Sequence, residues 1–367
     1  MNRRNFLIGA TATGVAAYTM YSNPLTAMGK LPTGARKTRI LASPQYRDGS
    51  FKNDLQTPDI VPPHTYWSVA KAYTETVPNK EPAKPILVSS PNFSLPKQEA
   101  DPILTWLGHS TYVLQWPGFN LVMDPVFHRC SPVSFAGPKP YEGMDSFSIN
   151  ALPEVIDVLI LSHDHYDHLD YLTLAAIQPR VKHIVTSLGV GEHLEYWGFD
   201  PKIITELDWW ENHQLGANGT ITATPARHFS GRGFTRNQTL WASFVLERGD
   251  KRYFIGGDSG YGPHFKVIGD KFGPFDWAFL ECGQYHPAWG LIHMMPAEVP
   301  MAAQDLQAER LVPVHWAKFT LALHPWTEPA ELVLKAAKAL NQPIYFPLPG
   351  ASTALSSLDD NKWWDKA

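Results

Sequence analysis

Three histidines lie within six consecutive residues, at His163, His165 and His168, together with the carboxylate of Asp167. In extended backbone, residues i and i+2 point to the same side, so His163 and His165 are expected to present two imidazoles to one point. If the chain turns into a helix directly afterwards, Asp167 and His168 face a second point nearby. Imidazoles and carboxylates are ligands that suit zinc and similar metals. The spacing therefore predicts a metal site rather than a polar loop with chance histidines.

Further ligands must come from other segments, because four residues cannot complete two metal sites. Three candidates each follow a predicted strand: His228, Asp258 and His315. Taken alone, each is explained as a turn residue or a cap. Because ligand sites collect at the carboxyl edge of a sheet, the three together predict one active-site rim.

The elements that must position these residues begin with a continuous apolar run at residues 157–161, which is typical of a buried strand. A helix is predicted for residues 169–178. Hairpins in both halves of the chain, with helices between them, indicate two packed sheets covered by helices. The other predicted strands are 103–107, 111–116, 120–123, 183–187, 220–224, 240–246, 253–255, 277–280 and 311–314, and the other predicted helices are 297–309 and 329–340.

The first region, residues 1–29, has the form of a twin-arginine export signal. Arg3 and Arg4 precede a weakly apolar stretch that is too short for a spanning helix. The alternative is an ordinary N-terminal helix with two exposed arginines. Export would place the folded protein in the periplasm, either cleaved near Ala27 or kept on the membrane by an uncleaved anchor.

Two more regions follow. Residues 30–100 are rich in proline, which breaks helices and is excluded from central strands. They predict an irregular arm that wraps the domain and is attached by Tyr66, Trp67 and Phe93. Residues 101–367 are then the catalytic domain.

Composition excludes several classes of protein. The 31 Lys and Arg residues against 35 Asp and Glu residues show no basic excess for a nucleic acid. Two cysteines, Cys130 and Cys282, are too few for a disulfide scaffold or a cysteine-based zinc module, and they either pair or remain thiols. The oligomeric state is not predicted.

The order of motifs over residues 64–350 resembles the metallo-β-lactamase superfamily. More narrowly, it is similar to N-acyl-phosphatidylethanolamine-hydrolysing phospholipase D and its bacterial relatives. Asp170 favours the narrower group, because many other members of the superfamily have glycine shortly after the ligands. The matching motifs are TWLGHST at 105–111, DPVF at 124–127, GPK at 137–139, SHDHYDHLD at 162–170, GDSGY at 257–261, FGPFD at 272–276 and VHWAKF at 314–319.

The resemblance implies an α+β fold, the αββα sandwich of two mixed sheets flanked by helices, and a site for two zinc ions. One zinc would take His163, His165 and His228, the other Asp167, His168 and His315, and Asp258 would bridge them. Asp124 either orients a ligand histidine or forms a plain Asp-Pro turn. His109 either supports the ligands or is structural.

The activity implied is hydrolysis of a phosphodiester, by a hydroxide that the two metal ions share. Asp258 would take part as the bridging ligand. His293 matches a histidine near the family's active site and either contacts the substrate or leaving group or has a structural role at a helix entry. Tyr285 and His286 are weaker candidates. Other divalent metals are allowed by the same ligands.

The substrate is expected to be an ordinary or N-acylated glycerophospholipid, with peripheral membrane contact. Trp209, Trp210, Trp289, Trp326, Trp363 and Trp364 are expected mainly to pack and otherwise to contact lipid, and Phe127, Phe135 and Tyr141 are candidates for an acyl groove. The alternatives are a lactonase or another ester or amide hydrolase on the same site, and a non-catalytic metal-binding periplasmic protein. A di-iron redox protein is disfavoured, because it would carry Glu in place of His165.

Overall fold

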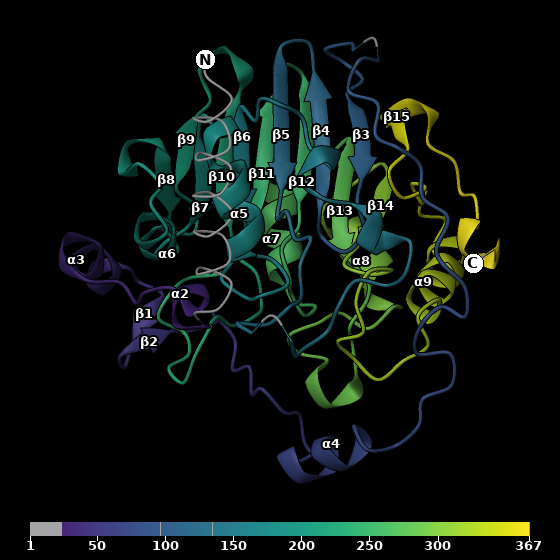
Figure 1. Ribbon diagram of the computed structural model, residues 1–367, viewed down its shortest axis with the longest axis horizontal. Helices are drawn as coiled ribbons and strands as arrows, with labels where there is room; N and C mark the ends of the chain where they lie inside the picture. Colours follow the sequence, from purple (N-terminus) through teal and green to yellow (C-terminus); the bar gives the residue numbers. More distant parts are fainter. Residues whose placement is uncertain (1–23, 96, 134, 367) are drawn as a thin grey trace, which may run out of the picture.

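Two mixed β-sheets stacked face to face form the centre of the molecule, and helices flank them (Figure 1). The structure is a computed structural model and describes residues 24–95, 97–133 and 135–366. This architecture confirms the predicted αββα sandwich.

The first sheet has seven strands in the order β15-β3-β4-β5-β6-β7-β8. Pairing is antiparallel from β15 to β5 and parallel from β5 to β8. Strands β3, β5 and β6 therefore end at the same edge. The strands are β3 (Ile103–Trp106), β4 (Tyr112–Trp116), β5 (Phe119–Met123), β6 (Val158–Leu161), β7 (Ile184–Ser187), β8 (Ile204–Leu207) and β15 (Ser352–Ala354).

The second sheet has six strands in the order β14-β13-β12-β11-β10-β9. Strand β11 runs against β10 and β12, while β12, β13 and β14 are parallel, so β10, β12, β13 and β14 share one edge. The strands are β9 (Asn212–Gln214), β10 (Thr220–Thr224), β11 (Ser243–Arg248), β12 (Lys251–Ile255), β13 (Trp277–Glu281) and β14 (Leu311–Val314).

Helices cover the two sheets. Helices α5 (Tyr171–Ile177) and α6 (Gly191–Tyr196) lie on the first sheet. The second sheet is covered by α7 (His264–Phe272), α8 (Glu298–Asp305) and α9 (Glu328–Ala339). Helix α5 begins where the sequence predicts, because the Asp170 side chain accepts a hydrogen bond from Leu172 N and caps the first turn.

Aromatic side chains between the sheets fill the core. The ring of Tyr112 on β4 stacks on Phe279 of β13 with centroids 4.7 Å apart, and Trp116 meets Tyr253 of β12 edge to face at 5.6 Å. Such pairs contribute about 0.5–1.5 kcal/mol beyond the area they bury. The two sheets, and the strand edges that carry the ligands, are thereby held in a fixed relation.

Several elements depart from the prediction. Residues 240–242 do not extend β11, because Leu240 N donates to Leu188 O and Ala242 N to Ser162 O at the edge of the other sheet. Helix α7 was not predicted; its mid-helix Gly269 lowers helix propensity. That glycine is needed there, since a Cβ would lie 2.0 Å from the carbonyl oxygen of Asp305 on α8. Short elements α6, β8, β9 and β15 were also missed.

The arm contains short elements: α3 (Gly34–Ala42), β1 (Tyr46–Arg47), β2 (Ser50–Phe51) and α4 (Tyr66–Ala72). Ile40, Phe51 and Ile86 attach it, each at most 2% exposed, and Phe93 packs against the core as expected. The predicted attachment by Tyr66 and Trp67 was wrong. They are 69% and 81% exposed, because α4 turns this face outward.

The N-terminal prediction lies largely outside the described residues, which exclude 1–23 and hence Arg3 and Arg4. The described part begins with α2 (Pro24–Met28). Among the residues described, no helix has the length and apolar character needed to cross a membrane.

The tryptophans and cysteines have simple outcomes. Trp209, Trp289, Trp326, Trp363 and Trp364 are buried and pack, which was the main expectation for them. Both cysteines are free, so the alternative of a disulfide was wrong.

Candidate metal centre

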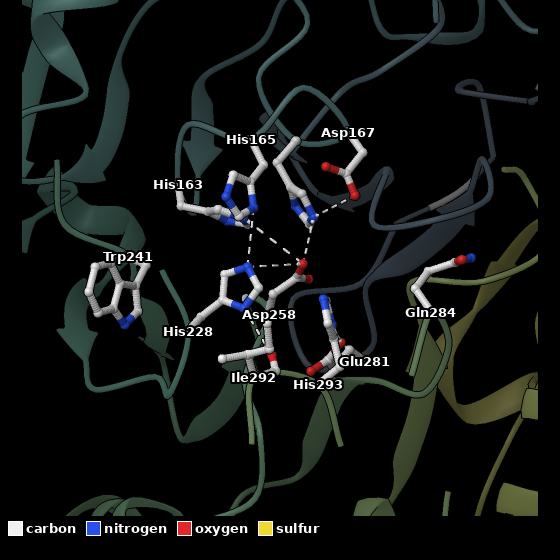
Figure 2. Close-up of polar contacts among 12 residues, drawn as sticks. His163, His165, Asp167, His228, Trp241, Asp258, Glu281, Gln284, Ile292 and His293 are labelled. Atoms are coloured by element: carbon white, nitrogen blue, oxygen red, sulfur yellow. Dashed lines mark hydrogen bonds and ion pairs between the residues drawn. The ribbon is translucent and has the colours of Figure 1, made fainter. Parts of the chain in front are cut away.

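All seven predicted ligands lie together where the ligand-bearing edges of the two sheets meet. Figure 2 labels His163, His165, Asp167, His228 and Asp258 among them. Four follow β6, and the other three follow β10, β12 and β14. The seven are His163, His165, Asp167, His168, His228, Asp258 and His315. Their burial and proximity follow from strand direction, since each of these strands ends at the same rim.

The first group consists of three imidazoles. The Nε2 of His163 lies 2.9 Å from Nδ1 of His165, which lies 3.2 Å from Nε2 of His228. The remote nitrogen of His228 lies 2.9 Å from the carbonyl oxygen of Ile292 and therefore carries the proton. Its Nε2 then directs a lone pair at the other two rings, which is the arrangement that a metal ion requires.

The second group joins Asp167, His168 and His315. The Nε2 of His168 lies 3.5 Å from Asp167 Oδ2, and the rings of His168 and His315 stack with centroids 5.1 Å apart. His109 Nε2 lies 3.0 Å from Asp167 Oδ2, so His109 supports this carboxylate.

Asp258 lies between the two groups. Its Oδ2 is 3.7 Å from His228 Nε2 and 3.1 Å from His168 Nε2. Its Oδ1 is 3.1 Å from His315 Nδ1. One carboxylate therefore faces both groups, as a bridging ligand would.

Unpaired buried atoms show that the residues fit metal ions. His168 Nε2, His315 Nε2 and Asp258 Oδ1 are buried and make no hydrogen bond of acceptable geometry among the described residues, although His168 Nε2 and Asp258 Oδ1 have polar neighbours at 3.1 Å. Leaving such atoms unpaired is costly, and coordination of a cation would satisfy them. The imidazole and carboxylate donors match zinc and its neighbours.

Electrostatics keep the donors in their metal-binding forms. Burial, together with the neighbouring imidazoles, holds the pKa of His163 well below its ordinary value, and burial does the same for His228. Burial alone would raise the pKa of Asp258, but His168 and His315 hold it well below the ordinary value. His163 and His228 are thus neutral and the Asp258 carboxylate is charged. His168 differs, because burial opposes its protonation but Asp258, Asp167 and Asp124 raise its pKa well above the ordinary value.

Asp124 directs one of the ligands. It follows β5, is fully buried, and its Oδ2 accepts from His168 Nδ1 at 2.7 Å and from Ser162 Oγ at 2.6 Å. This geometry matches the first reading of Asp124, in which it orients a ligand histidine, and not a plain turn. Such carboxylates fix the tautomer and the ring orientation of a ligand.

His293 lies beside the cluster, paired with a residue that sequence reasoning missed. Its Nδ1 is 2.6 Å from Oε2 of Glu281, and its ring is 5.0 Å from that of His228 (Figure 2). Burial opposes protonation, but Glu281 raises the pKa of His293 to about 9. Glu281 was detectable as the one charged residue ending the apolar strand Trp277–Glu281.

Tyr285 and His286 do not reach the cluster. The Tyr285 hydroxyl donates to Glu328 Oε1 at 2.5 Å, and Nδ1 of His286 accepts from Ala288 N to cap a helical turn. Both are structural, and neither lines the cleft beside the ligands among the described residues.

A cleft of about 330 Å³ opens over the cluster. The arm, which the sequence did not link to the site, supplies one wall of it. Phe127, Phe135 and Tyr141 are absent from its described lining, so their predicted role as an acyl groove there was wrong. The arm contributes Asp59, Ile60, Tyr66, Val69 and Tyr73, and the domain adds Phe229, Arg236, Gln284, Trp289, Ile292 and Leu321.

Comparison with known families gives a direct match. The profile of the Beta-lactamase superfamily domain matches residues 120–316, which include every predicted ligand. The chain belongs to the metallo-β-lactamase superfamily. It is a metal-dependent hydrolase of this fold, and the His/Asp cluster is its candidate metal-binding site.

Relatives of this superfamily hydrolase include an uncharacterized protein of Mycobacterium tuberculosis, 39% identical over 88% of this chain and 87% of the relative. The N-acyl-phosphatidylethanolamine-hydrolyzing phospholipase D 1 of Caenorhabditis elegans is 34% identical over 59% of this chain and 64% of that protein. Among solved structures, an isothiocyanate hydrolase from Delia radicum gut bacteria superposes with a TM-score of 0.53 at 21% identity, covering 69% of this chain and 98% of that one. This last likeness shows the fold.

Proposed function

We propose that this hydrolase binds two zinc ions and cleaves a phosphodiester bond, that of an ordinary or N-acylated glycerophospholipid. The observation that carries the proposal is the position of Asp258 between two groups of ligands, with its Oδ2 3.7 Å from His228 Nε2 in the first group and 3.1 Å from His168 Nε2 in the second. The similarity to the Caenorhabditis elegans phospholipase D supports the substrate class.

His163, His165 and His228 would hold one ion, Asp167, His168 and His315 the other, and Asp258 would bridge them. Bound there, the metal pair would activate water at neutral pH and neutralise charge on the phosphoryl oxygens. Glu281 holds the Nδ1 proton of His293 and turns the other side of the ring toward the cluster. When water attacks phosphorus and the bond to the alcohol breaks, the Nε2 proton of His293 would pass to the leaving oxygen.

The cleft walls support a lipid. Ile60, Val69 and Tyr73 of the arm line the cleft together with Trp289 and Leu321. The Tyr73 ring stacks on Trp289 with centroids 6.4 Å apart, so these residues form an apolar surface for an acyl chain. At the rim, Arg236 pairs with Asp59 and offers a cation near an incoming phosphate.

We also propose peripheral membrane contact through the exposed Tyr66 and Trp67 of α4, and export to the periplasm by the twin-arginine route. Replacing Arg3 and Arg4 by Lys should then leave the protein in the cytoplasm. An unchanged distribution between fractions would reject the export route.

Product analysis tests the activity. The purified protein is incubated with a mixed phospholipid extract, with and without a chelator, and the products are identified by mass spectrometry. Release of phosphatidic acid that stops on chelation and in Asp258→Asn is expected. A lactone, a β-lactam and bis(4-nitrophenyl) phosphate are assayed in parallel. Turnover of the lactone or lactam alone would reject the phosphodiester and favour the alternative hydrolase.

A further inference from the structure

Residues 26–30, just before the arm, are joined by one buried arginine to the metal-binding loop, residues 162–170. Arg232 is 5% exposed, and its Nη1 donates to the carbonyl oxygens of Asp164 and Leu169, both at 2.8 Å. These two residues flank the ligands His165, Asp167 and His168. Its Nε and Nη2 donate to the carbonyl oxygen of Ala27, at 3.2 and 2.7 Å.

A second connection runs through His193 on α6. Lys30 N donates to Nδ1 of His193 at 3.0 Å, which leaves the proton of a neutral ring on Nε2, 3.2 Å from Asp164 Oδ2. Asp164 is 3% exposed and also accepts from Gly231 N and Thr239 Oγ1, at 2.6 and 2.8 Å. Asp164 lies between the ligands His163 and His165. Its contacts with His193, Gly231 and Thr239 therefore hold this part of the metal-binding loop in place.

Residues 26–30 pack closely against Trp197 and His193. Thr26 O accepts from Trp197 Nε1 at 2.7 Å. Gly29 has φ of 75°, and a Cβ at this position would lie 2.1 Å from His193 Nδ1. Only glycine allows both this backbone conformation and this contact.

We propose that residues 26–30 are part of the functional enzyme and that Arg232 is a positioning residue, which uses them to hold the metal-binding loop in shape. This rests on the proposed metal site. A leader peptidase cut after Ala27 would remove the carbonyl that Arg232 needs, so the mature protein begins at or before Ala27.

The first test compares two glycine substitutions in the full chain. Gly29→Ala displaces residues 26–30 from His193. Gly34→Ala is the matched control, since Gly34 also has positive φ (55°) but has nothing within 4 Å of a Cβ. The dissociation constant for Zn²⁺, measured by competition with a chelator, should rise about 10-fold or more in Gly29→Ala and about twofold or less in Gly34→Ala. Equal affinities would overturn the proposal.

Arg232→Lys gives a second measurement, because a lysine cannot bridge three carbonyl oxygens. Zn²⁺ affinity should fall as in Gly29→Ala, whereas Arg39→Lys, at an exposed arginine of α3, should have no effect. Val333→Ala, which opens a cavity in α9 far from the loop, separates loss of general stability from loss of metal. If Val333→Ala lowers Zn²⁺ affinity as much as Arg232→Lys, the role of Arg232 is structural only and the proposal fails.

The mature N-terminus completes the test. Mass spectrometry of the exported protein should find a first residue at or before Ala27, with full metal content. A mature chain that begins at Met28 or later and keeps its metal would overturn this inference while leaving the proposed function intact. A full chain that binds no Zn²⁺ at all would overturn both.

Discussion

At the residue scale, the site depends on the second nitrogen of three of the ligand imidazoles. His168 is directed by Asp124, His228 by the carbonyl of Ile292, and His163 by Ser162 Oγ at 2.9 Å. Each of these contacts leaves the other nitrogen facing the cluster. The ligands are therefore arranged for metal by their neighbours before any metal binds.

Asp124→Asn tests this arrangement. The Asn amide carries no negative charge, so it holds the Nδ1–H group of His168 less strongly than the carboxylate does. The Zn²⁺ dissociation constant should therefore rise about 10- to 100-fold while the fold is kept. Titration with a chromophoric chelator measures the affinity, and circular dichroism checks the fold. Asp145→Asn, at an exposed loop carboxylate, is the control. Unchanged affinity in Asp124→Asn would show that Asp124 is only a turn residue.

Lys318, which is not one of the metal ligands, provides a pH-dependent test. Its side chain is fully buried, its Nζ donates to Leu107 O at 3.0 Å, and burial lowers its pKa to about 7. Between about pH 7 and 10 the unfolded chain binds a proton that the folded chain does not. The free energy of unfolding should therefore fall as the pH is lowered through this window, and this residue adds no further loss below about pH 7.

Lys318→Met removes this dependence. The free energy of unfolding of both proteins is measured with urea at pH 8 and pH 10. The difference, variant minus wild type, should be about 2 kcal/mol larger at pH 8 than at pH 10, since one pKa unit corresponds to about 1.4 kcal/mol. A difference between the two proteins that is constant with pH would contradict the assignment.

At the scale of elements, α3 of the arm is fixed to α6 and β8 by one guanidinium. Arg36 contacts Glu192 at 2.7 Å, Glu195 at 2.5 Å and Glu206 at 2.6 Å, and its side chain is 13% exposed. Arg39, on the same helix, forms an ion pair with Glu211 in which both side chains are more than 40% exposed. Burial therefore distinguishes two ion pairs that look alike in sequence.

Arg36→Ala should lower the free energy of unfolding by about 2–4 kcal/mol, because it leaves buried carboxylates with fewer partners. Arg39→Ala should change it by less than about 1 kcal/mol. Urea denaturation of both variants measures the difference. Similar effects of the two substitutions would mean that α3 is not held by the Arg36 network.

At the scale of the whole molecule, the metal centre joins the two sheets. His163, His165, Asp167 and His168 come from the seven-stranded sheet, and His228, Asp258 and His315 from the six-stranded one. Ions bound between them stabilise only the folded state. The gain is about 2.7 kcal/mol when the free metal is at 100 times its dissociation constant.

Chelation should therefore lower the melting temperature by about 5 °C or more, and added Zn²⁺ should restore it. Differential scanning calorimetry measures the shift. Asp258→Asn, which lacks the bridging carboxylate, should melt at nearly the same temperature with and without chelator. A wild-type melting temperature insensitive to chelator and to Zn²⁺ would reject a tightly bound metal.

Local sequence determined the parts of this protein that depend on neighbouring residues. The alternation at His163 and His165, the apolar run before them and the polar residues after three later strands predicted the candidate ligands. Hairpins with helices between them indicated two packed sheets, and the αββα sandwich itself was implied by the resemblance of the motifs to the superfamily. These signals are readable because side-chain direction in a strand and burial of an apolar run are set within a few residues.

Tertiary structure alone decided which distant groups act on those ligands. Three contacts join segments far apart in the chain: Glu281 with His293, the arm residues with the rest of the cleft lining, and residues 26–30 with Arg232. The same is true of Trp67, whose exposure depends on the direction in which α4 leaves the domain. Such contacts are specified by the packing of whole elements, for which no single segment carries a local signal.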